Sequence, residues 1–428
     1  MKFKTLKGAA LVAATSMLPI SQVAMAEGNV NISGWVNEGI MFYDDGVGSD
    51  VVQSSDNGTT LNSRITFTGS YDLPSTSMQA GFEITMEPTS GFGGDVFGTS
   101  ANPLIANQEA GGFSDGNAFA TGVTTLASNI YMSGGWGKLT IGTQSMPTDN
   151  IAVLEDPSMT LWTNVSPVFR GGGFTVQGLT GAGAGASFAN FLQCIGTQGL
   201  GIGIDCNGIY RNGIRYDLPA FGPVTIAIGY ANDDIYDVAA KYKGDFGNFG
   251  TQLALGYSVN NGLSRAGQAA GLSAGGDSAE TFQMQAGAMH KPTGIFGAVS
   301  YQHEEADGVS AAMSNASSDS TDSWYFKGGI KKQWFSIGDT SIGGSYGQYH
   351  DQYGVAGVSA GVAAGVNGSE VDRYSFGVTQ YFGSRFQVYG NYENLDLDVD
   401  CASGTACVGT YNGSDSLDMF TLGGIFFF

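Results

Sequence analysis

Polar and apolar residues alternate in short segments along most of the chain. In NSRITFTGSYDLP (62–74), Arg64 and every second residue after it form a polar face, while Ile65, Phe67 and Tyr71 lie on an opposite, apolar face. A period of two residues predicts a β-strand whose faces meet different surroundings. Sixteen such segments occur, mostly near the ~10 residues that a tilted strand needs to cross a bilayer. They span 29–43, 61–73, 77–88, 128–134, 137–145, 208–218, 222–231, 235–244, 249–259, 280–290, 294–304, 322–333, 339–350, 371–382, 385–397 and 416–428.

The connections between these segments alternate between short and long. DLPST (72–76) and KPTG (291–294) are examples of the short connections, and 89–127 and 146–207 are examples of the long ones. The link after Ala231 is an exception, because it is short where a long one is due. Short turns at one end and long loops at the other are typical of outer-membrane barrels. A soluble β-sandwich has no reason to alternate its loop lengths in this way.

The two faces indicate which side meets lipid. Apolar residues make up 42% of the chain, too few to fill the interior of so large a barrel. We therefore expect the apolar faces to point outward and the polar faces to line a water-filled lumen. The sheet has to close, because an open edge in lipid leaves backbone groups unpaired. The sequence thus predicts an all-β fold, a 16-stranded antiparallel transmembrane β-barrel with short periplasmic turns and long extracellular loops.

The last segment, SDSLDMFTLGGIFFF (414–428), is expected to close this barrel. Counting back in twos from Phe428 gives Phe426, Gly424, Leu422 and Phe420. This spacing predicts a terminal strand whose aromatic face is turned to the membrane.

The first 26 residues have the pattern of a secretory signal peptide. Three lysines precede a short apolar stretch, and Ala24-Met25-Ala26 form a small-x-small cleavage site. Cleavage after Ala26 would leave 27–428 as one barrel domain, since no linker composition divides the chain. The mature chain of 402 residues has 14 Lys and Arg against 38 Asp and Glu, a formal charge of −24. This balance argues against a nucleic-acid partner.

Four cysteines form two pairs that are close in sequence: Cys194 with Cys206, and Cys401 with Cys407. In a secreted protein, local disulfides are the expected outcome. A zinc site is the alternative, but no histidine lies near either pair. Such disulfides would stiffen exposed loops.

Five stretches carry a resemblance to a known family: SRITFTGSYDL (63–73), GKLTIGTQ (137–144), YRNGIRYDLPAFG (210–222), VTQYFGSRFQVYGNYENL (378–395) and the terminal Phe428. In this order the chain resembles the general Gram-negative porins over nearly its whole mature length. The resemblance implies a 16-stranded homotrimer in the cell outer membrane, in contact with lipid and lipopolysaccharide. It also implies that the barrel assembly machinery reads the terminal aromatic residues, Phe428 and Phe426.

The resemblance further implies a constriction of the lumen. The third long loop, at about 146–207, would fold inward and oppose arginines on the wall. The loop acids are Asp149, Glu155 and Asp156, and the wall arginines are Arg64, Arg211 and Arg215. Opposed charges in a narrow pore produce a transverse field. The fourth strand has no basic residue at 129–132, so the wall carries fewer basic residues than is usual in the family. For the loop acids, the alternative interpretation is an acidic loop surface in contact with solvent.

These features favour a passive channel for small hydrophilic solutes and ions over other functions. The acidic balance predicts a weak cation preference that shrinks as salt rises. A substrate-specific channel for a sugar or phosphate is the alternative, and a structural or adhesive barrel is a further one. An enzyme would need a nucleophile beside a base, whereas the three histidines are scattered, at 290, 303 and 350. We expect no cofactor and no bound metal, apart from divalent ions that loosely bridge loop carboxylates.

Overall fold

The computed structural model describes most of the chain after residue 28. The described residues are 29–55, 63–89, 122–153, 156–160, 163, 171, 174–179, 186–194, 210–232, 234–261, 278–307, 320–353, 365–411 and 413–428. The predicted signal peptide, 1–26, lies outside them.

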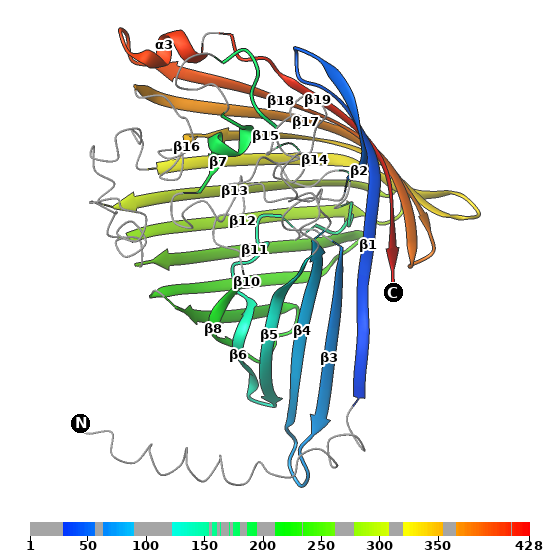
Figure 1. Ribbon diagram of the computed structural model, residues 1–428. Helices are drawn as coiled ribbons and strands as arrows, with labels where there is room; N and C mark the ends of the chain where they lie inside the picture. Colours follow the sequence, from blue (N-terminus) through cyan, green and yellow to red (C-terminus); the bar gives the residue numbers. More distant parts are fainter. Residues whose placement is uncertain are drawn as a thin grey trace.

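A closed antiparallel β-barrel of sixteen strands forms the body of the molecule (Figure 1). Each predicted segment corresponds to one barrel strand, so the predicted fold class is confirmed. These strands are β1 (Asn29–Asp44), β3 (Arg64–Asp72), β4 (Gln79–Thr89), β5 (Gly122–Gly134), β6 (Gly137–Ser145), β8 (Tyr210–Asp217), β9 (Val224–Ala231), β10 (Ile235–Phe246), β11 (Phe249–Asn260), β12 (Ser278–His290), β13 (Ile295–Asp307), β14 (Ser320–Phe335), β15 (Gly338–His350), β17 (Val366–Phe382), β18 (Phe386–Cys401) and β19 (Leu417–Phe427).

Strand β1 closes the barrel by pairing with different strands along its length. Its later half pairs with β19, from Trp35 opposite Phe427 to Asp44 opposite Asp418. Its first half pairs with β3. Phe428 adds the last two bonds, because its backbone N–H donates to Gly34 O at 3.1 Å and its carbonyl accepts from Gly34 N–H at 3.0 Å.

A short strand that the alternation did not predict, β2 (Ser49–Ser55), pairs with the later half of β1. It occupies the position beside β1 that β3 does not reach, because β3 begins only at Arg64. The turn between β1 and β2 is closed by Asp45, whose Oδ1 accepts from the backbone N–H of Val47 and Gly48 at 3.1 and 2.9 Å. The sequence DDGVG contains the Asp-Gly pair typical of such hairpin turns.

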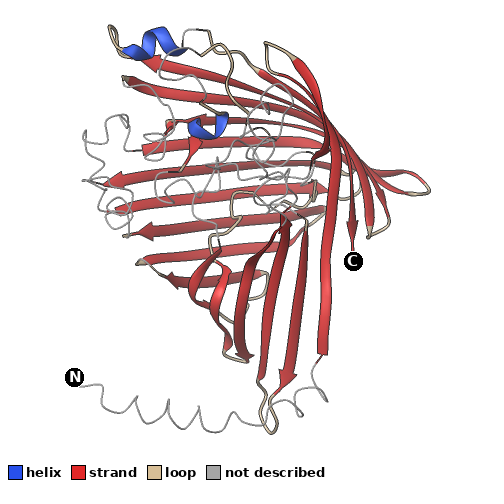
Figure 2. Ribbon diagram, viewed as in Figure 1, coloured by secondary structure: helices blue, strands red, loops and turns tan. Residues whose placement is uncertain are grey.

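Small elements lie inside and above the barrel (Figure 2). The 3-10 turn η4 (Phe188–Phe191) leads into β7 (Leu192–Gln193), which pairs in parallel with β16 (Gln352–Tyr353). A six-residue helix, α3 (Ala406–Tyr411), precedes β19.

The wall shows the expected orientation of faces around most of its circumference. Phe420, Leu422 and Phe426 on β19 point outward and are 43–49% exposed. On β12 and β13, the inward side chains Gln283 and Gln302 are buried and hydrogen-bonded to each other at 2.8 Å. The outer face is thus apolar where it meets lipid, as in transmembrane barrels.

Within the described part of the chain, no helix is both long enough and apolar enough to cross a membrane.

One sector of the inner wall contradicts the expected polar lumen. At the loop ends of β1, β17, β18 and β19 the inward side chains are apolar and fully buried, as Tyr43, Val371, Leu395 and Leu417 are. They belong to one apolar cluster with residues of the third long loop. These faces are apolar on the inside because a loop covers them, which alternation within a strand cannot reveal.

Candidate functional site

The third long loop, between β6 and β8, runs along the inner wall as a constriction loop would. Thr148 binds β10, since both its backbone N–H and its hydroxyl donate to Asp237 Oδ2 at 2.9 Å. Farther along, the Ala152 carbonyl accepts from Gln285 Nε2 on β12 at 3.4 Å. The described first part of the loop is therefore attached to successive strands.

Asp156 is the strongest of these attachments. Its Oδ2 lies 2.5 Å from Nζ of Lys327 on β14, and each side chain is only 3% exposed. Ser158 supports the carboxylate with its hydroxyl, at 2.6 Å, and with its backbone N–H, at 3.0 Å. A buried ion pair is secure only when the remaining polar atoms are satisfied. Asp156 is thus neutralised by the wall and acts as an anchor of the loop.

Two further contacts carry the loop onto β14 and β17. Lys331 Nζ donates to Ser158 O at 3.1 Å, and the Tyr381 hydroxyl donates to Met159 O at 3.3 Å. Beyond them, the Thr163 and Thr379 hydroxyls are 3.4 Å apart. Lys327 and Lys331 therefore both face the loop.

The later part of the loop fills one side of the lumen. Phe174, Phe188 and Phe191 are buried in the apolar cluster. Phe174 meets Tyr43 of β1 edge-on at 5.1 Å between ring centroids, and Phe191 meets Tyr411 of α3 at 5.7 Å. Such aromatic pairs add about 0.5–1.5 kcal/mol beyond area burial. We infer that the open path follows the opposite sector, on β3 to β10.

That opposite sector holds the three predicted arginines, and all three point inward. Arg64 on β3 forms an ion pair with Glu87 on β4 at 2.8 Å. Its guanidinium also lies over the Trp35 ring, 4.4 Å from the centroid, a favourable cation–π geometry. The side chain is only 11% exposed, so Arg64 is held on the wall and does not project across the pore.

Arg215 is also paired within the wall. Its Nε and Nη2 donate to Asp217 Oδ1 at 3.0 and 2.7 Å, and Nη1 donates to Ser145 O at 3.0 Å. Arg211 lies on the same inward face of β8. Both Arg211 and Arg215 interact electrostatically with Asp237. Arg64 and Arg215 are thus paired with acids of the wall, and the expected opposition of wall arginines to loop acids stays a prediction.

Asp149 is the loop acid that lies in this charged sector. It interacts electrostatically with Tyr210, as do Arg64, Glu83 and Glu87. Asp149 Oδ1 accepts from Asn150 Nδ2 at 2.7 Å. The structure thus places Asp149 and Asp156 at different parts of the wall, and Glu155 lies outside the described residues.

The sequence interpretation missed four acids in this sector. Glu83 and Glu87 share the inward face of β4, and Asp217 and Asp237 lie on β8 and β10. The same period-two count that selected Arg211 and Arg215 includes Asp217, so this signal was available. With Asp149, five acids accompany the three arginines, and Lys138 on β6 and Lys241 and Lys243 on β10 also lie on the inward face.

A second buried pair lies on the far wall. Arg373 on β17 is ion-paired with Glu393 on β18, and both side chains are almost fully buried. Arg373 is therefore held within the wall. Within the described ranges, no group of three or more His, Cys, Asp or Glu residues is placed to hold a metal ion.

The structure contains the Cys401–Cys407 disulfide. Cys194 is also disulfide-bonded, but Cys206 lies outside the described residues, so that pairing stays a prediction. Cys407 and Cys194 are buried in or beside the apolar cluster. Both sulfurs are buried, whereas Ser403, Gly404 and Ala406 between Cys401 and Cys407 are exposed; the stiffening of these loops stays a prediction.

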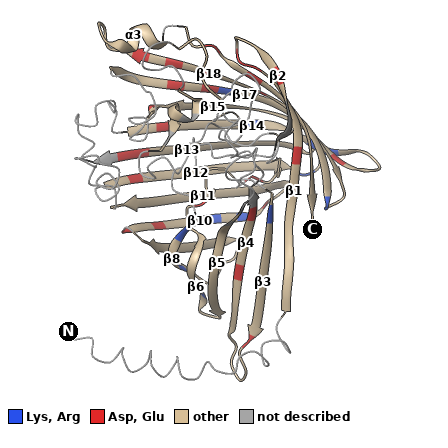
Figure 3. Ribbon diagram, viewed as in Figure 1, with Lys and Arg blue, Asp and Glu red and all other residues tan. Residues whose placement is uncertain are grey.

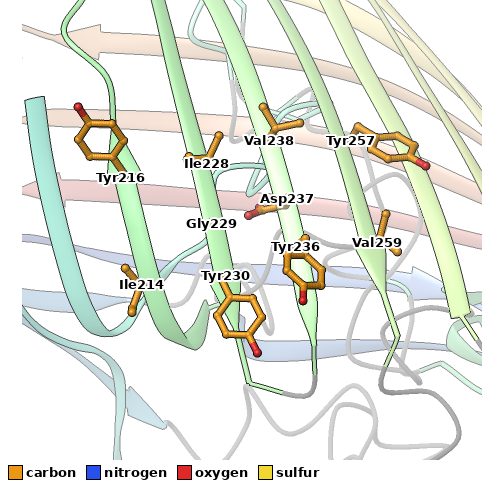
Figure 4. A pocket seen from close by; sticks show the side chains of 10 residues that line it. All are labelled: Ile214, Tyr216, Ile228, Gly229, Tyr230, Tyr236, Asp237, Val238, Tyr257 and Val259. Atoms are coloured by element: carbon orange, nitrogen blue, oxygen red, sulfur yellow. The ribbon is translucent and has the colours of Figure 1, made fainter. Parts of the chain in front are cut away.

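An apolar depression of about 480 Å³ on β8 to β11 belongs to the outer wall (Figure 4). Ile228 and Val238 lie at its centre, and tyrosines such as Tyr216 and Tyr257 surround them. The Asp237 carboxylate in this region binds Thr148 on the lumen side. The depression opens to the membrane and is not part of the channel.

The closed barrel, its apolar outer face and its loop-narrowed, charged lumen define a channel-type outer-membrane β-barrel. A family model described as Gram-negative porin matches residues 8–400. The chain therefore belongs to the Gram-negative porin family and is a protein of the outer membrane.

Two solved structures have the same fold. An anion-selective porin from Comamonas acidovorans superposes with a TM-score of 0.53 at 19% identity, over 94% of this chain and 100% of that chain. A loop L8 deletion mutant of OmpT, an outer membrane protein of Vibrio cholerae, gives a TM-score of 0.50 at 12% identity, over 94% and 99%. No curated protein sequence is significantly similar to the chain.

Proposed function

We propose that this porin is a passive channel for small hydrophilic solutes and ions, with a weak preference for cations. The observation that carries the proposal is the acidic balance of the mature chain, 38 Asp and Glu against 14 Lys and Arg. In the open sector the charges nearly cancel, because Arg64, Arg211 and Arg215 and the inward-facing Lys138, Lys241 and Lys243 lie there with five acids. The five acids are Glu83, Glu87, Asp149, Asp217 and Asp237.

The charge beyond the constriction supports the same preference. Figure 3 shows Asp and Glu near the loop ends of β13, β17 and β18. Acids around a pore mouth concentrate cations, and salt of about 0.1 M screens them beyond ~10 Å. The preference should therefore shrink as salt rises. The related porin from Comamonas acidovorans is described as anion-selective, so we propose opposite preferences on one fold.

Replacing Glu83 with Gln and Asp149 with Asn tests the preference. Each change removes a negative charge from the open sector without adding bulk, so the reversal potential in a KCl gradient should move toward anion selectivity. Glu38→Gln is the matched control, because Glu38 is exposed on the outer face of β1, away from the lumen and the pore mouth. If Glu83→Gln and Asp149→Asn leave the potential where the control does, these residues do not line the ion path.

A substrate-specific channel is the second candidate. The apolar cluster that fills one side of the lumen supports it, because a narrowed path is easier to fit to one solute. Liposome swelling with neutral sugars of rising size separates the two candidates. Rates that fall smoothly with size indicate passive diffusion, and one sugar that enters far faster than its size predicts indicates specificity.

We further propose that the protein acts as a homotrimer in contact with lipid and lipopolysaccharide. Its signal peptide, 1–26, would be removed on export, and the barrel assembly machinery would read Phe428 and Phe426. The family resemblance supports these proposals, as does the outward orientation of both rings, which are 42% and 49% exposed. The short turns would then lie in the periplasm and the long loops outside the cell.

A further inference from the structure

Four glycines of the inner wall lie where the third loop touches it. They are Gly229 on β9, Gly256 on β11, Gly287 on β12 and Gly377 on β17. Each is buried beneath, or packed against, a described segment of the loop between residues 146 and 163. Glycines in strand interiors often mark close approach of another backbone.

An added side chain at each of these four positions would crowd the loop. A Cβ would lie 3.1 Å from Ile151 Cγ1 at Gly256 and 2.9 Å from Pro157 Cδ at Gly287, and at Gly377 it would overlap the Cβ of Thr163. At Gly229 it would overlap Oδ1 of Asp237, the side chain that holds Thr148, and lie 2.8 Å from Pro147 Cδ. Carbon atoms in contact prefer about 3.5–4.0 Å. The loop thus approaches the wall closely at all four glycines, and most closely at Gly377.

Polar anchors lie beside the glycine contacts. Asp237, which binds Thr148, is directly opposite Gly229 in the sheet, and Thr379, near Thr163, is two residues from Gly377. The glycines set how closely the loop approaches, and the polar groups hold it at that distance. Both kinds of contact recur from β9 to β17.

We infer that Gly229, Gly256, Gly287 and Gly377 are positioning residues that set the width of the channel. On this account the first part of the third loop is a fixed layer of the wall and not a moving gate. The wall strands are paired on both sides, so an added side chain displaces the loop into the lumen and not the sheet outward. The inference rests on the proposed channel function.

Substitutions at Gly377 test the inference by single-channel conductance. Gly377→Ala should lower the conductance and Gly377→Val should lower it further, because each added carbon pushes the loop inward. Gly250→Val is the matched control. Gly250 also faces the lumen, on β11, but an added Cβ meets no atom closer than 3.6 Å. Its conductance should match the wild type, which excludes an effect of added bulk alone.

A compensating exchange identifies the loop as the affected element. Gly377→Ala combined with Thr163→Gly should recover the conductance of Thr163→Gly alone, because the overlapping Cβ is removed from the loop. The double variant distinguishes a clash with the loop from a clash with Asn391 on β18, whose Oδ1 would also lie 2.9 Å from the added Cβ. Unchanged conductance in both Gly377 variants, or no recovery in the double variant, would overturn the inference.

A second measurement does not depend on current. The temperature at which the folded barrel unfolds in SDS should fall in Gly377→Ala and recover in the double variant. If wild-type protein conducts no ions but this coupling is present, the channel proposal fails and the seating of the loop stands. If the coupling is absent as well, the inference fails too. A Gly377→Val protein that folds only together with Thr163→Gly also supports it.

Discussion

At the scale of single residues, the charges of the lumen are set by partners as much as by position. Alternation within a strand predicts that Arg64, Arg211 and Arg215 face inward, and they do. It does not predict that Arg64 pairs with Glu87 across β3 and β4, or that Asp156 pairs with Lys327 from a distant strand. Such pairs depend on the register between strands and on the path of a loop, which one sequence does not display.

The Asp156–Lys327 pair should be important for the stability of the folded barrel. Asp156→Asn and Lys327→Met each leave one buried charge without its counter-charge, a change that costs roughly 3–5 kcal/mol. We expect a clear fall in the SDS unfolding temperature for both. The double variant should recover much of the loss, because no charge is then left alone.

The exposed pair Lys291–Asp245, 2.6 Å apart with side chains 48% and 63% exposed, provides the comparison. Exposed pairs contribute about 0–1 kcal/mol, so Asp245→Asn should hardly change the unfolding temperature. Equal losses at both pairs would show that the buried pair does not anchor the third loop.

At the scale of elements, strand content was predictable and loop structure was not. All sixteen barrel strands follow from the period of two, because each has one face in lipid. Strand β2, which the period of two did not predict, pairs with the later half of β1. The apolar inner faces of β17 to β19 resemble lipid-facing ones in sequence, and only their contact with Phe174 and Phe191 explains them.

The C-terminal strand carries a testable assembly signal. Deleting Phe428 removes both its outward ring and its two backbone hydrogen bonds with Gly34, so less folded, heat-modifiable protein should reach the outer membrane. Phe428→Ala keeps the backbone bonds and loses only the ring. If the ring is the signal, this variant should be nearly as depleted as the deletion, and Phe428→Tyr should be close to normal. Normal amounts of the deletion variant would refute the role.

The disulfides give a second prediction at this scale. Non-reducing peptide mapping should find Cys194 linked to Cys206, with the Cys401–Cys407 link as an internal reference. Both pairs are local, and the compartment outside the inner membrane is oxidising. A free thiol at either position, or a link between the two pairs, would contradict the assignment.

At the scale of the whole molecule, a closed barrel combines with an inward loop, a charged lumen and an acidic chain. The apolar cluster occupies one sector, and the charged residues of β3 to β10 occupy the other. A barrel of sixteen strands leaves an aqueous channel. The third loop narrows this channel from the side of the apolar cluster, and the opposite side keeps its charged residues. The central claim is that this open sector conducts ions.

Planar-bilayer recording of the purified protein tests that claim most directly. We predict stepwise increases of current that are proportional to voltage, and a reversal potential of weak cation selectivity that declines as KCl is raised. A folded protein that inserts into the bilayer but produces no current steps would contradict the account, since the lumen would then be plugged.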